Sequence, residues 1–196
     1  MKVYGIDVSK IDAENNKWDG YLSNYRKDKV KRLKRPEKKA QSIGAELVLN
    51  YAVGKEIGKK PEYDIDENGK PYLTNADGVY FNLSHSGDYA VCVVHDSSVG
   101  IDIQKMKKFD AAMIKRFFTD EEKEYIEKSK EMKKAFFEIW SKKESFIKAV
   151  GKGLRIPLNS FSVCGDIIEY GGNIYRFKKY TVSKQGYMVY VCYAVK

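Results

Sequence analysis

The stretch Val-Gly-Ile-Asp-Ile-Gln-Lys, residues 99–105, places an acidic side chain between two isoleucines. A short apolar run of this kind is typical of a buried strand. Successive side chains of a strand point to opposite faces. We therefore expect Ile101 and Ile103 to point into the core, while Asp102 and Gln104 point together the other way.

A similar stretch, Tyr-Gly-Ile-Asp-Val-Ser-Lys, occupies residues 4–10, about half a chain earlier. Each copy is followed by helical patterns and then by strand patterns, which indicates a duplicated unit. A chance similarity of so few residues is the alternative. Duplication predicts an α+β fold of two similar halves with mainly antiparallel sheets, residues 1–98 and 99–196.

Apolar spacing and turn signals predict the elements within each half. Thr119 and Glu122 form a capping-box pattern that starts a helix. That helix is expected to pause near Ser129 and to run from Glu131 to Val150. The other expected elements are helices over 23–35 and 37–57, the latter with Ala40, Ile43, Leu47, Leu49 and Tyr51 as apolar positions, strands at 2–8, 79–83 and 88–95, a polar turn at 84–87, and three antiparallel strands within 161–195.

The composition suits a folded domain, since 43% of the 196 residues are hydrophobic. The apolar stretches are shorter than the roughly 20 residues that span a bilayer, so we expect no membrane segment. The N-terminus has no apolar signal-peptide region. Three cysteines in strand-like surroundings are expected to be buried free thiols. Together these features predict a cytoplasmic protein.

The net charge of +9 is concentrated between Arg26 and Lys39, where nine residues are Lys or Arg. Such a run is commonly a solvated helix face. It also suits a landing surface for a polyanion, such as nucleic acid, a phosphate-rich cofactor or an acidic protein. Composition does not choose between the two interpretations.

Three side chains of the last predicted helix, Trp140, Glu144 and Lys148, repeat every four residues and share one face. With Asp102, they would provide two carboxylates and a lysine, which suits Mg²⁺ bound to phosphate oxygens. The alternative is a Lys-Glu helix pair and a satisfied Asp at a strand end, and spacing alone favours it.

His85 lies in the polar turn and is one of two histidines. A lone histidine in a turn is commonly structural or solvated. The chain has no Gly-x-Ser-x-Gly elbow, no Cys/His spacing for zinc and no phosphate-binding P-loop.

Three motifs, Phe81-Asn-Leu-Ser-His-Ser-Gly87, Gly100-Ile-Asp-Ile-Gln-Lys105 and Trp140-Ser-Lys-Lys-Glu-Ser-Phe-Ile-Lys148, occur in the order and spacing of one family. The chain resembles the 4′-phosphopantetheinyl transferases, in particular the Sfp type, which consists of two similar halves related by pseudo-twofold symmetry. Further similar stretches, such as Gly69-Lys-Pro-Tyr72 and Gly151-Lys-Gly-Leu154, extend the resemblance over most of the chain.

This resemblance implies a Mg²⁺-dependent transfer of the phosphopantetheine arm of coenzyme A to a serine of an acyl, peptidyl or aryl carrier protein. The other product is adenosine 3′,5′-bisphosphate. The first half would hold the adenosine end of coenzyme A, and the second half the metal and catalytic residues. The protein would be a monomer with no nucleic-acid or membrane partner.

Matching the motifs residue by residue implies three groups of site residues. The metal would be held by Asp102 and Glu144, with Gln104 facing it directly or through water. Coenzyme A would contact Arg26, Lys29, Lys70, Ser84, His85 and Lys148. The catalytic residues would be Glu144, Lys148 and His85.

Gln104 departs from the family pattern, because many Sfp-type members have Glu there. A neutral amide cannot accept a proton at neutral pH. The base that deprotonates the carrier serine is then Glu144 or a metal-bound water, and we favour Glu144. Two rival hypotheses are a coenzyme A-binding pseudoenzyme and a basic nucleic-acid-binding protein.

Overall fold

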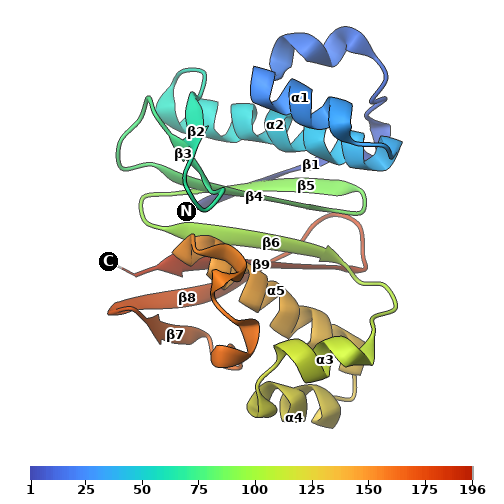
Figure 1. Ribbon diagram of the computed structural model, residues 1–196, viewed down its shortest axis with the longest axis vertical. Helices are drawn as coiled ribbons and strands as arrows, with labels where there is room; N and C mark the ends of the chain where they lie inside the picture. The colour runs from blue at the N-terminus through green and yellow to red at the C-terminus, as the bar shows by residue number, and fades with distance from the viewer. Residues whose placement is uncertain (196) are drawn as a thin grey trace.

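The first half of the chain folds into two helices over a small antiparallel sheet. The computed structural model describes residues 1–195 (Figure 1). Two short 3₁₀ turns, η1 (Val8–Lys10) and η2 (Asn16–Tyr21), follow the first strand. The main elements are β1 (Lys2–Asp7), α1 (Asn24–Arg32), α2 (Pro36–Ile57), β2 (Tyr63–Ile65), β3 (Pro71–Leu73), β4 (Tyr80–Ser86) and β5 (Tyr89–His95).

The second half again begins with a strand, continues through helices and ends in strands. Its elements are β6 (Val99–Lys105), α3 (Ala111–Phe117), α4 (Asp120–Lys128), α5 (Met132–Val150), η3 (Gly153–Arg155), η4 (Leu158–Ser160), β7 (Ile167–Tyr170), β8 (Asn173–Tyr180) and β9 (Tyr187–Ala194). The capping box of Thr119 and Glu122 starts α4, and α5 ends at Gly151, whose φ of 84° is favourable for glycine. The predicted pause near Ser129 is confirmed.

The strand order is similar in the two halves. The first sheet has the order β1-β5-β4 and the second β6-β9-β8-β7, both antiparallel, and β2 and β3 form a separate hairpin. In each half the first strand lies beside the last, and the last beside the strand before it. The α+β class is confirmed, and this shared order supports the duplication. The exact division at residue 98 stays a prediction.

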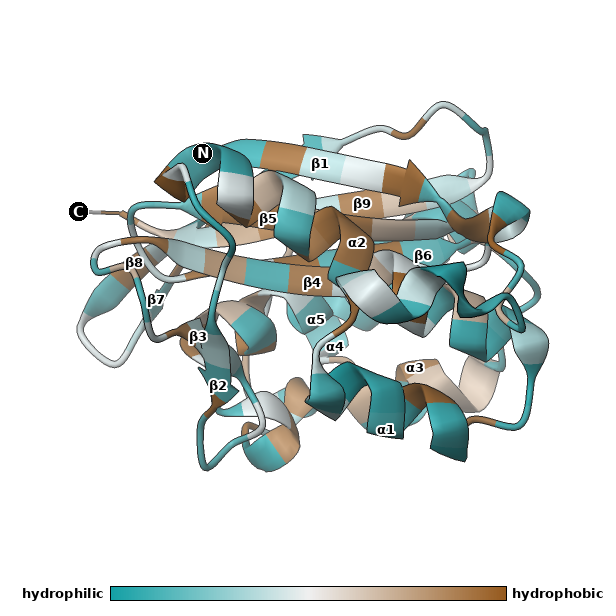
Figure 2. Cartoon of the chain, turned by 90° about the horizontal axis from the view of Figure 1, so that it is seen from above, coloured by the Kyte–Doolittle hydropathy of each residue, from teal (hydrophilic) through white to brown (hydrophobic). Residues whose placement is uncertain are grey.

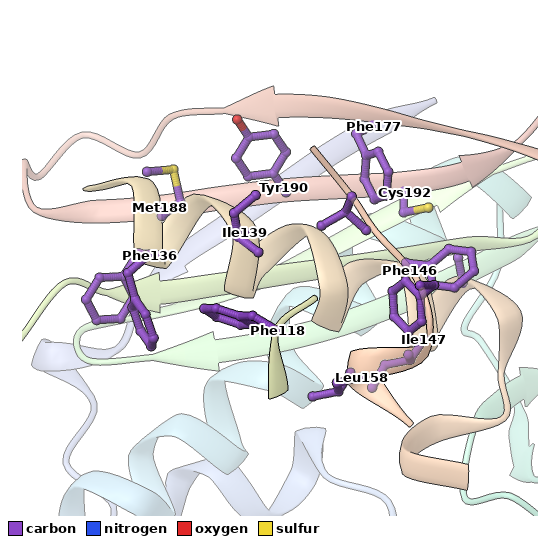
Figure 3. Packing of buried hydrophobic residues seen from close by; sticks show 14 of the residues in the cluster. Phe118, Phe136, Ile139, Phe146, Ile147, Leu158, Phe177, Met188, Tyr190 and Cys192 are labelled. Atoms are coloured by element: carbon purple, nitrogen blue, oxygen red, sulfur yellow. The ribbon is translucent and has the colours of Figure 1, made fainter. Parts of the chain in front are cut away.

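Two buried clusters fill the halves, and a third joins them. Helix α2 covers the first sheet, while α5 covers β6 and β9, with Phe136, Ile139 and Phe146 in its core (Figure 3). The joining cluster includes Ile101 and Ile103, both fully buried against valines of β5 and β9. Burial of each isoleucine contributes roughly 1.5–3 kcal/mol. The expected orientation of this strand is confirmed.

The sheets of the two halves meet through side chains, because β4 and β6 form no backbone ladder with each other. Alternate polar side chains of β4 accept the backbone amides of β6 instead. The N–H groups of Ile101, Ile103 and Lys105 donate to Asn82 Oδ1 at 3.0 Å, Ser84 Oγ at 3.3 Å and Ser86 Oγ at 3.0 Å. These three amides at the edge of β6 are therefore satisfied at the contact between the halves.

Two local predictions were wrong. The expected polar turn at 84–87 is the end of β4, and the turn lies at Gly87 and Asp88, where Gly87 has a φ of 55°. Polar residues persist in this strand because β6 amides need them as acceptors. Tyr51, expected to face inward, is 61% exposed on α2, whereas polar Glu46 is buried. No helix within residues 1–195 has the length and apolar character to cross a membrane.

Candidate active site

Gly100 lets helix α5 lie directly on strand β6. A Cβ atom at this position would be 2.1 Å from the carbonyl oxygen of Ser145 and 2.4 Å from the amide nitrogen of Ala149. At Gly5, its counterpart in the first half, a Cβ atom would make only ordinary van der Waals contacts, with Val91 Cγ1 at 3.5 Å and the carbonyl oxygen of Ala90 at 3.8 Å. Gly100 is therefore required for the close packing of α5 on β6. This packing brings Asp102 against the helix.

Asp102 is 2% exposed and accepts three side-chain hydrogen bonds. The Lys148 ammonium lies 2.6 Å from its Oδ1 atom, to which Ser84 Oγ also donates at 3.1 Å. Gln104 Nε2 donates to Oδ2 at 2.9 Å. Lys148 Nζ also donates to the carbonyl of Ile101 at 3.1 Å. A buried carboxylate is costly without such partners, so these contacts explain how the strand holds an acid.

Glu144 lies one helical turn before Lys148. Burial raises the pKa of its carboxyl group, Lys148 opposes that rise, and the negative charge of Asp102 adds to it. No hydrogen bond or ion pair from within residues 1–195 was found for its carboxylate. A cation bound between the two carboxylates would offset the repulsion that Asp102 exerts on Glu144.

The donor set fits a hard divalent cation with an incomplete protein shell. Asp102 and Glu144 supply carboxylate oxygens, and the amide oxygen of Gln104 remains after its nitrogen has bonded Asp102. No group of three or more His, Cys, Asp or Glu side chains arranged for a metal occurs within residues 1–195. Mg²⁺ commonly uses one or two carboxylates and fills its shell with phosphate and water oxygens.

A groove leads from Lys148 across strand β4 to helix α1. Its first part, a cavity of about 230 Å³, is bordered by Lys148, Lys70 and Gly151. Its second part, of about 170 Å³, is bordered by Arg26, Lys29 and His85. Both parts share Gly69, Pro71, Asn82 and Leu83, so they adjoin along β4. Figure 2 shows α1, the β2–β3 hairpin and α5 on the same side of β4.

The α1 end of the groove is strongly basic, but its two cations differ in role. Arg26 is buried and its Nε donates to Glu46 at 3.0 Å, so it also holds α1 on α2. Lys29 is exposed, and partial desolvation followed by the charge of Arg26 lowers its pKa. Lys29 is thus the cation that a ligand can reach without breaking a buried ion pair.

His85 is neutral at pH 7 in this structure. Desolvation, together with the nearby cations Lys38, Lys148, Lys29 and Arg26, lowers its pKa to about 4. The side chain is nonetheless exposed at the edge of the groove. An anion bound in the groove would offset these cations and favour the protonated ring.

Lys70 connects the hairpin to the end of α5. Its Nζ donates to the carbonyl of Ala149 at 3.0 Å, and desolvation lowers its pKa to about 8. A lysine at a helix C-terminus is favoured by the helix dipole. Lys70 therefore borders the groove from the first half while bonding the second.

A buried ion pair fixes helix α5 against α4 and the segment that follows α5. Lys143 Nζ lies 2.8 Å from Glu122, with both side chains fully buried, and donates to the carbonyls of Leu158 and Phe161 at 2.6 Å each. Glu122 also accepts the amide of Val163 at 2.9 Å. These bonds join α4, α5 and the segment that follows α5.

The structure brings the sequence-predicted residues into one cluster and an adjoining groove that share Lys148. Asp102, Gln104, Ser84 and Lys148 are in direct contact, and Glu144 lies beside them. Lys70, His85, Arg26 and Lys29 border the rest of the groove. Sequence reasoning missed Asn82 and Ser86, although their alternation with Ser84 was a strand signal. It also missed the partners Glu46 and Glu122 of the buried cations, which no local pattern reveals.

Comparison with known proteins finds one consistent family. A model of the 4′-phosphopantetheinyl transferase superfamily matches residues 98–189. A 4′-phosphopantetheinyl transferase of Bacillus subtilis is 34% identical over 170 residues, which covers 83% of this chain and 76% of that protein. The 4′-phosphopantetheinyl transferase Sfp of Bacillus subtilis strain 168 is 33% identical with the same coverage. The 4′-phosphopantetheinyl transferase psf-1 of Bacillus pumilus is 31% identical over 172 residues, 83% of this chain and 74% of that protein.

Proposed function

Because this chain belongs to the 4′-phosphopantetheinyl transferase superfamily, we propose a role for each residue of the groove in that reaction. The enzyme transfers the 4′-phosphopantetheine arm of coenzyme A to a carrier protein. The observation that carries the assignment of roles is the groove itself. Lys148, whose ammonium is paired with Asp102, borders one end of the groove, and Lys29 and His85 border the other.

The pyrophosphate of coenzyme A is assigned to the Lys148 end and its 3′-phosphate to the Lys29 end. Lys148 is a flexible cation whose ammonium already borders the cavity. Lys29 and His85 lie where the groove meets α1, and both lose hydration there. Charge-assisted hydrogen bonds to phosphate contribute about 1.5–3 kcal/mol each, which is enough to orient a polyanion.

Transfer is an in-line displacement at the phosphorus that carries pantetheine. The carrier serine Oγ forms a bond to this phosphorus while the bridging phosphorus–oxygen bond breaks. Adenosine 3′,5′-bisphosphate leaves with the electron pair of that bond. We assign the serine proton to Glu144, whose raised pKa makes it a better base near neutral pH. Lys148 stabilises the charge that develops on the phosphate oxygens of the leaving adenosine 3′,5′-bisphosphate.

Mg²⁺ is proposed as the cation at Asp102 and Glu144, with Gln104 facing it. When bound, it would polarise the phosphate oxygens and offset their charge. In the free protein Lys148 neutralises Asp102. The long side chain of Lys148 allows its ammonium to turn from the Asp102 carboxylate toward the phosphates of bound coenzyme A. The monomeric state and the cytoplasmic location expected from the sequence stay predictions, as does the identity of the carrier as acyl, peptidyl or aryl.

The test is the intact mass of an apo carrier protein after incubation with coenzyme A and Mg²⁺. Wild-type enzyme is expected to add the phosphopantetheine mass, and excess EDTA to prevent the addition. Asp102→Asn, which removes a charge at constant shape, is expected to abolish loading. Asp7→Asn is the matched control, because Asp7 is the acid of the first copy and pairs with Lys184 outside the groove.

Full activity of Asp102→Asn at saturating Mg²⁺ would remove Asp102 from the site. Wild-type enzyme that binds coenzyme A but loads none of a panel of acyl, peptidyl and aryl carriers would support the pseudoenzyme hypothesis instead.

A further inference from the structure

A single buried carboxylate joins the elements that border the α1 end of the groove. Glu46 on α2 is 2% exposed and accepts three hydrogen bonds. Its Oε2 atom accepts Arg26 Nε at 3.0 Å and the Tyr63 hydroxyl at 2.7 Å. Its Oε1 atom accepts the backbone amide of Ser23, the N-cap residue of α1, at 3.2 Å. Glu46 thus connects α2 to the first turn of α1 and to strand β2 of the hairpin.

Two of the side chains that Glu46 holds border the groove itself. Arg26 and Tyr63 both line its second cavity, and the residue of α2 in that lining is Ala45. Ser23 Oγ lies 3.1 Å from the Tyr63 hydroxyl, so this hydroxyl is held by α1 as well as by α2. A buried carboxylate that holds two groove residues can affect a ligand by positioning them or by its own charge.

The guanidinium of Arg26 keeps donors for a ligand while its ion pair with Glu46 is intact. A guanidinium has five N–H donors in a planar fork. In Arg26, Nε donates to Glu46 and Nη1 donates to Ser42 Oγ at 3.4 Å. Nη2 has no hydrogen-bond partner within residues 1–195. A phosphate can therefore take the Nη2 donors without breaking the buried ion pair, and Glu46 and Ser42 already hold the fork in one orientation.

We propose that Glu46 is a positioning residue, which orients the Arg26 guanidinium toward the phosphate bound at the α1 end of the groove. The proposal rests on the proposed function, because it concerns the same coenzyme A site. By its charge alone, a carboxylate near a phosphate opposes anion binding. Loss of that charge would strengthen binding of the phosphate, whereas loss of a positioning contact would weaken it. The two roles of Glu46 therefore predict changes of opposite sign.

Glu56 offers a matched control on the same helix. It also accepts a tyrosine hydroxyl and a cation, from Tyr4 at 2.8 Å and from Lys2 at 2.9 Å. Both partners belong to β1, which borders neither cavity of the groove. Glu46→Gln and Glu56→Gln therefore raise the net charge equally, but only the first releases a residue of the groove.

The test compares the dissociation constants of dephospho-coenzyme A and coenzyme A by calorimetry in EDTA, together with kcat and KM for coenzyme A. The ratio of the two constants reports what the 3′-phosphate contributes to binding. Glu46→Gln is expected to reduce this ratio roughly tenfold, as the weakening of one charge-assisted hydrogen bond would do. Its KM should rise while kcat stays within about twofold of wild type. Glu56→Gln is expected to match wild type in all three quantities.

The same substitution in an Arg26→Ala background separates positioning from a general loosening of the fold. There Glu46→Gln should change the ratio by less than about twofold, because the group that it positions is already absent. If Glu46→Gln does not fold, Tyr63→Phe takes its place, since it removes only the hydroxyl bonded to the same Oε2 atom. This variant should lower the ratio by a smaller amount, and again only when Arg26 is present.

An unchanged or increased ratio in Glu46→Gln, or in Tyr63→Phe where it takes its place, would overturn the proposal. An equal decrease with and without the Arg26 side chain would also overturn it, because Glu46 would then act only by supporting the fold. Carrier loading by the wild-type enzyme reports on the proposed function itself. Failure of that function and failure of this proposal are therefore distinguishable.

Discussion

Replacing Glu122 by Gln would leave the ammonium of Lys143 buried without a counter-charge. The two side chains are fully buried and 2.8 Å apart. The carbonyls of Leu158 and Phe161 would still accept from the ammonium, so its hydrogen bonds survive while its charge is uncompensated. The change keeps shape and most hydrogen bonds and removes one charge, so it isolates the electrostatic contribution to stability.

The expected loss is large for a single substitution. Breaking a buried ion pair by removing one partner costs about 3–5 kcal/mol, because the remaining charge stays in a low-dielectric environment. In a chain of this size each kcal/mol shifts Tm by roughly 2–4 °C, so we expect Tm to fall by roughly 6–20 °C. Loss of the pair also loosens helix α5, which carries Glu144 and Lys148. The variant should therefore lose activity at temperatures well below its unfolding temperature.

Thermal and urea unfolding followed by circular dichroism measures this loss. Glu121→Gln is the matched control: Glu121 precedes Glu122 and accepts Ser162 Oγ at the surface, so its replacement should change stability by less than about 0.5 kcal/mol. In the double variant Glu122→Gln with Lys143→Met, the loss of unfolding free energy should be smaller than the sum of the losses in the two single variants by about 0.5–3 kcal/mol. Equal stability of the Glu122 and Glu121 variants would refute the reasoning.

Four further outcomes are expected. Gly100→Ala should lower unfolding free energy by at least about 1–3 kcal/mol through overpacking, whereas Gly5→Ala should be nearly neutral, as urea unfolding will show. Gln104→Glu should keep transfer activity and raise Mg²⁺ affinity, and its Tm without metal should fall because a third acid adds repulsion. If the wild-type enzyme is instead almost inactive and Gln104→Glu restores transfer, a carboxylate at position 104 is the essential base. In calorimetry, Lys29→Ala should weaken binding of coenzyme A roughly tenfold or more and binding of dephospho-coenzyme A much less. Equal weakening of both ligands would show that Lys29 acts only through long-range electrostatic attraction and does not contact the 3′-phosphate. An NMR titration should place the His85 pKa at about 4 in the free protein and at a higher value with adenosine 3′,5′-bisphosphate bound. Because the ring titrates near 6.5 in the unfolded chain, the contribution of neutral His85 to folding stability is lost as pH falls from 6.5 toward 4.

Local sequence patterns predicted the elements whose bounds depend on interactions between neighbouring residues. The Thr119–Glu122 capping box, the end of α5 at Gly151 and the alternating strand at 99–105 were all predicted with nearly the observed bounds. These features depend on residues within a few positions of each other. The repeated Gly-Ile-Asp motif predicted the similar topology of the two halves, but it did not show that only Gly100 is needed for close helix packing.

Features that depend on distant partners could not be predicted. The polar residues around His85 read as a turn because the acceptors that β6 needs resemble turn residues. Arg26 borders the groove and its contact with coenzyme A stays a prediction, but its ion pair with Glu46, 20 residues later on another helix, has no signal in the local sequence. Ser84 matched a family motif, yet its bonds to Asp102 and Lys148 come from the contact between halves.

The central claim is that a strand buries Asp102 in order to hold a divalent cation together with Glu144. The most direct measurement is anomalous diffraction from crystals of the enzyme grown with coenzyme A and Mn²⁺. The account predicts one strong peak within ligand distance of both carboxylates and of the pyrophosphate oxygens, with Lys148 turned from Asp102 toward the phosphates. Coenzyme A bound in the groove with Lys148 still on Asp102, and no peak between the two carboxylates, would contradict it.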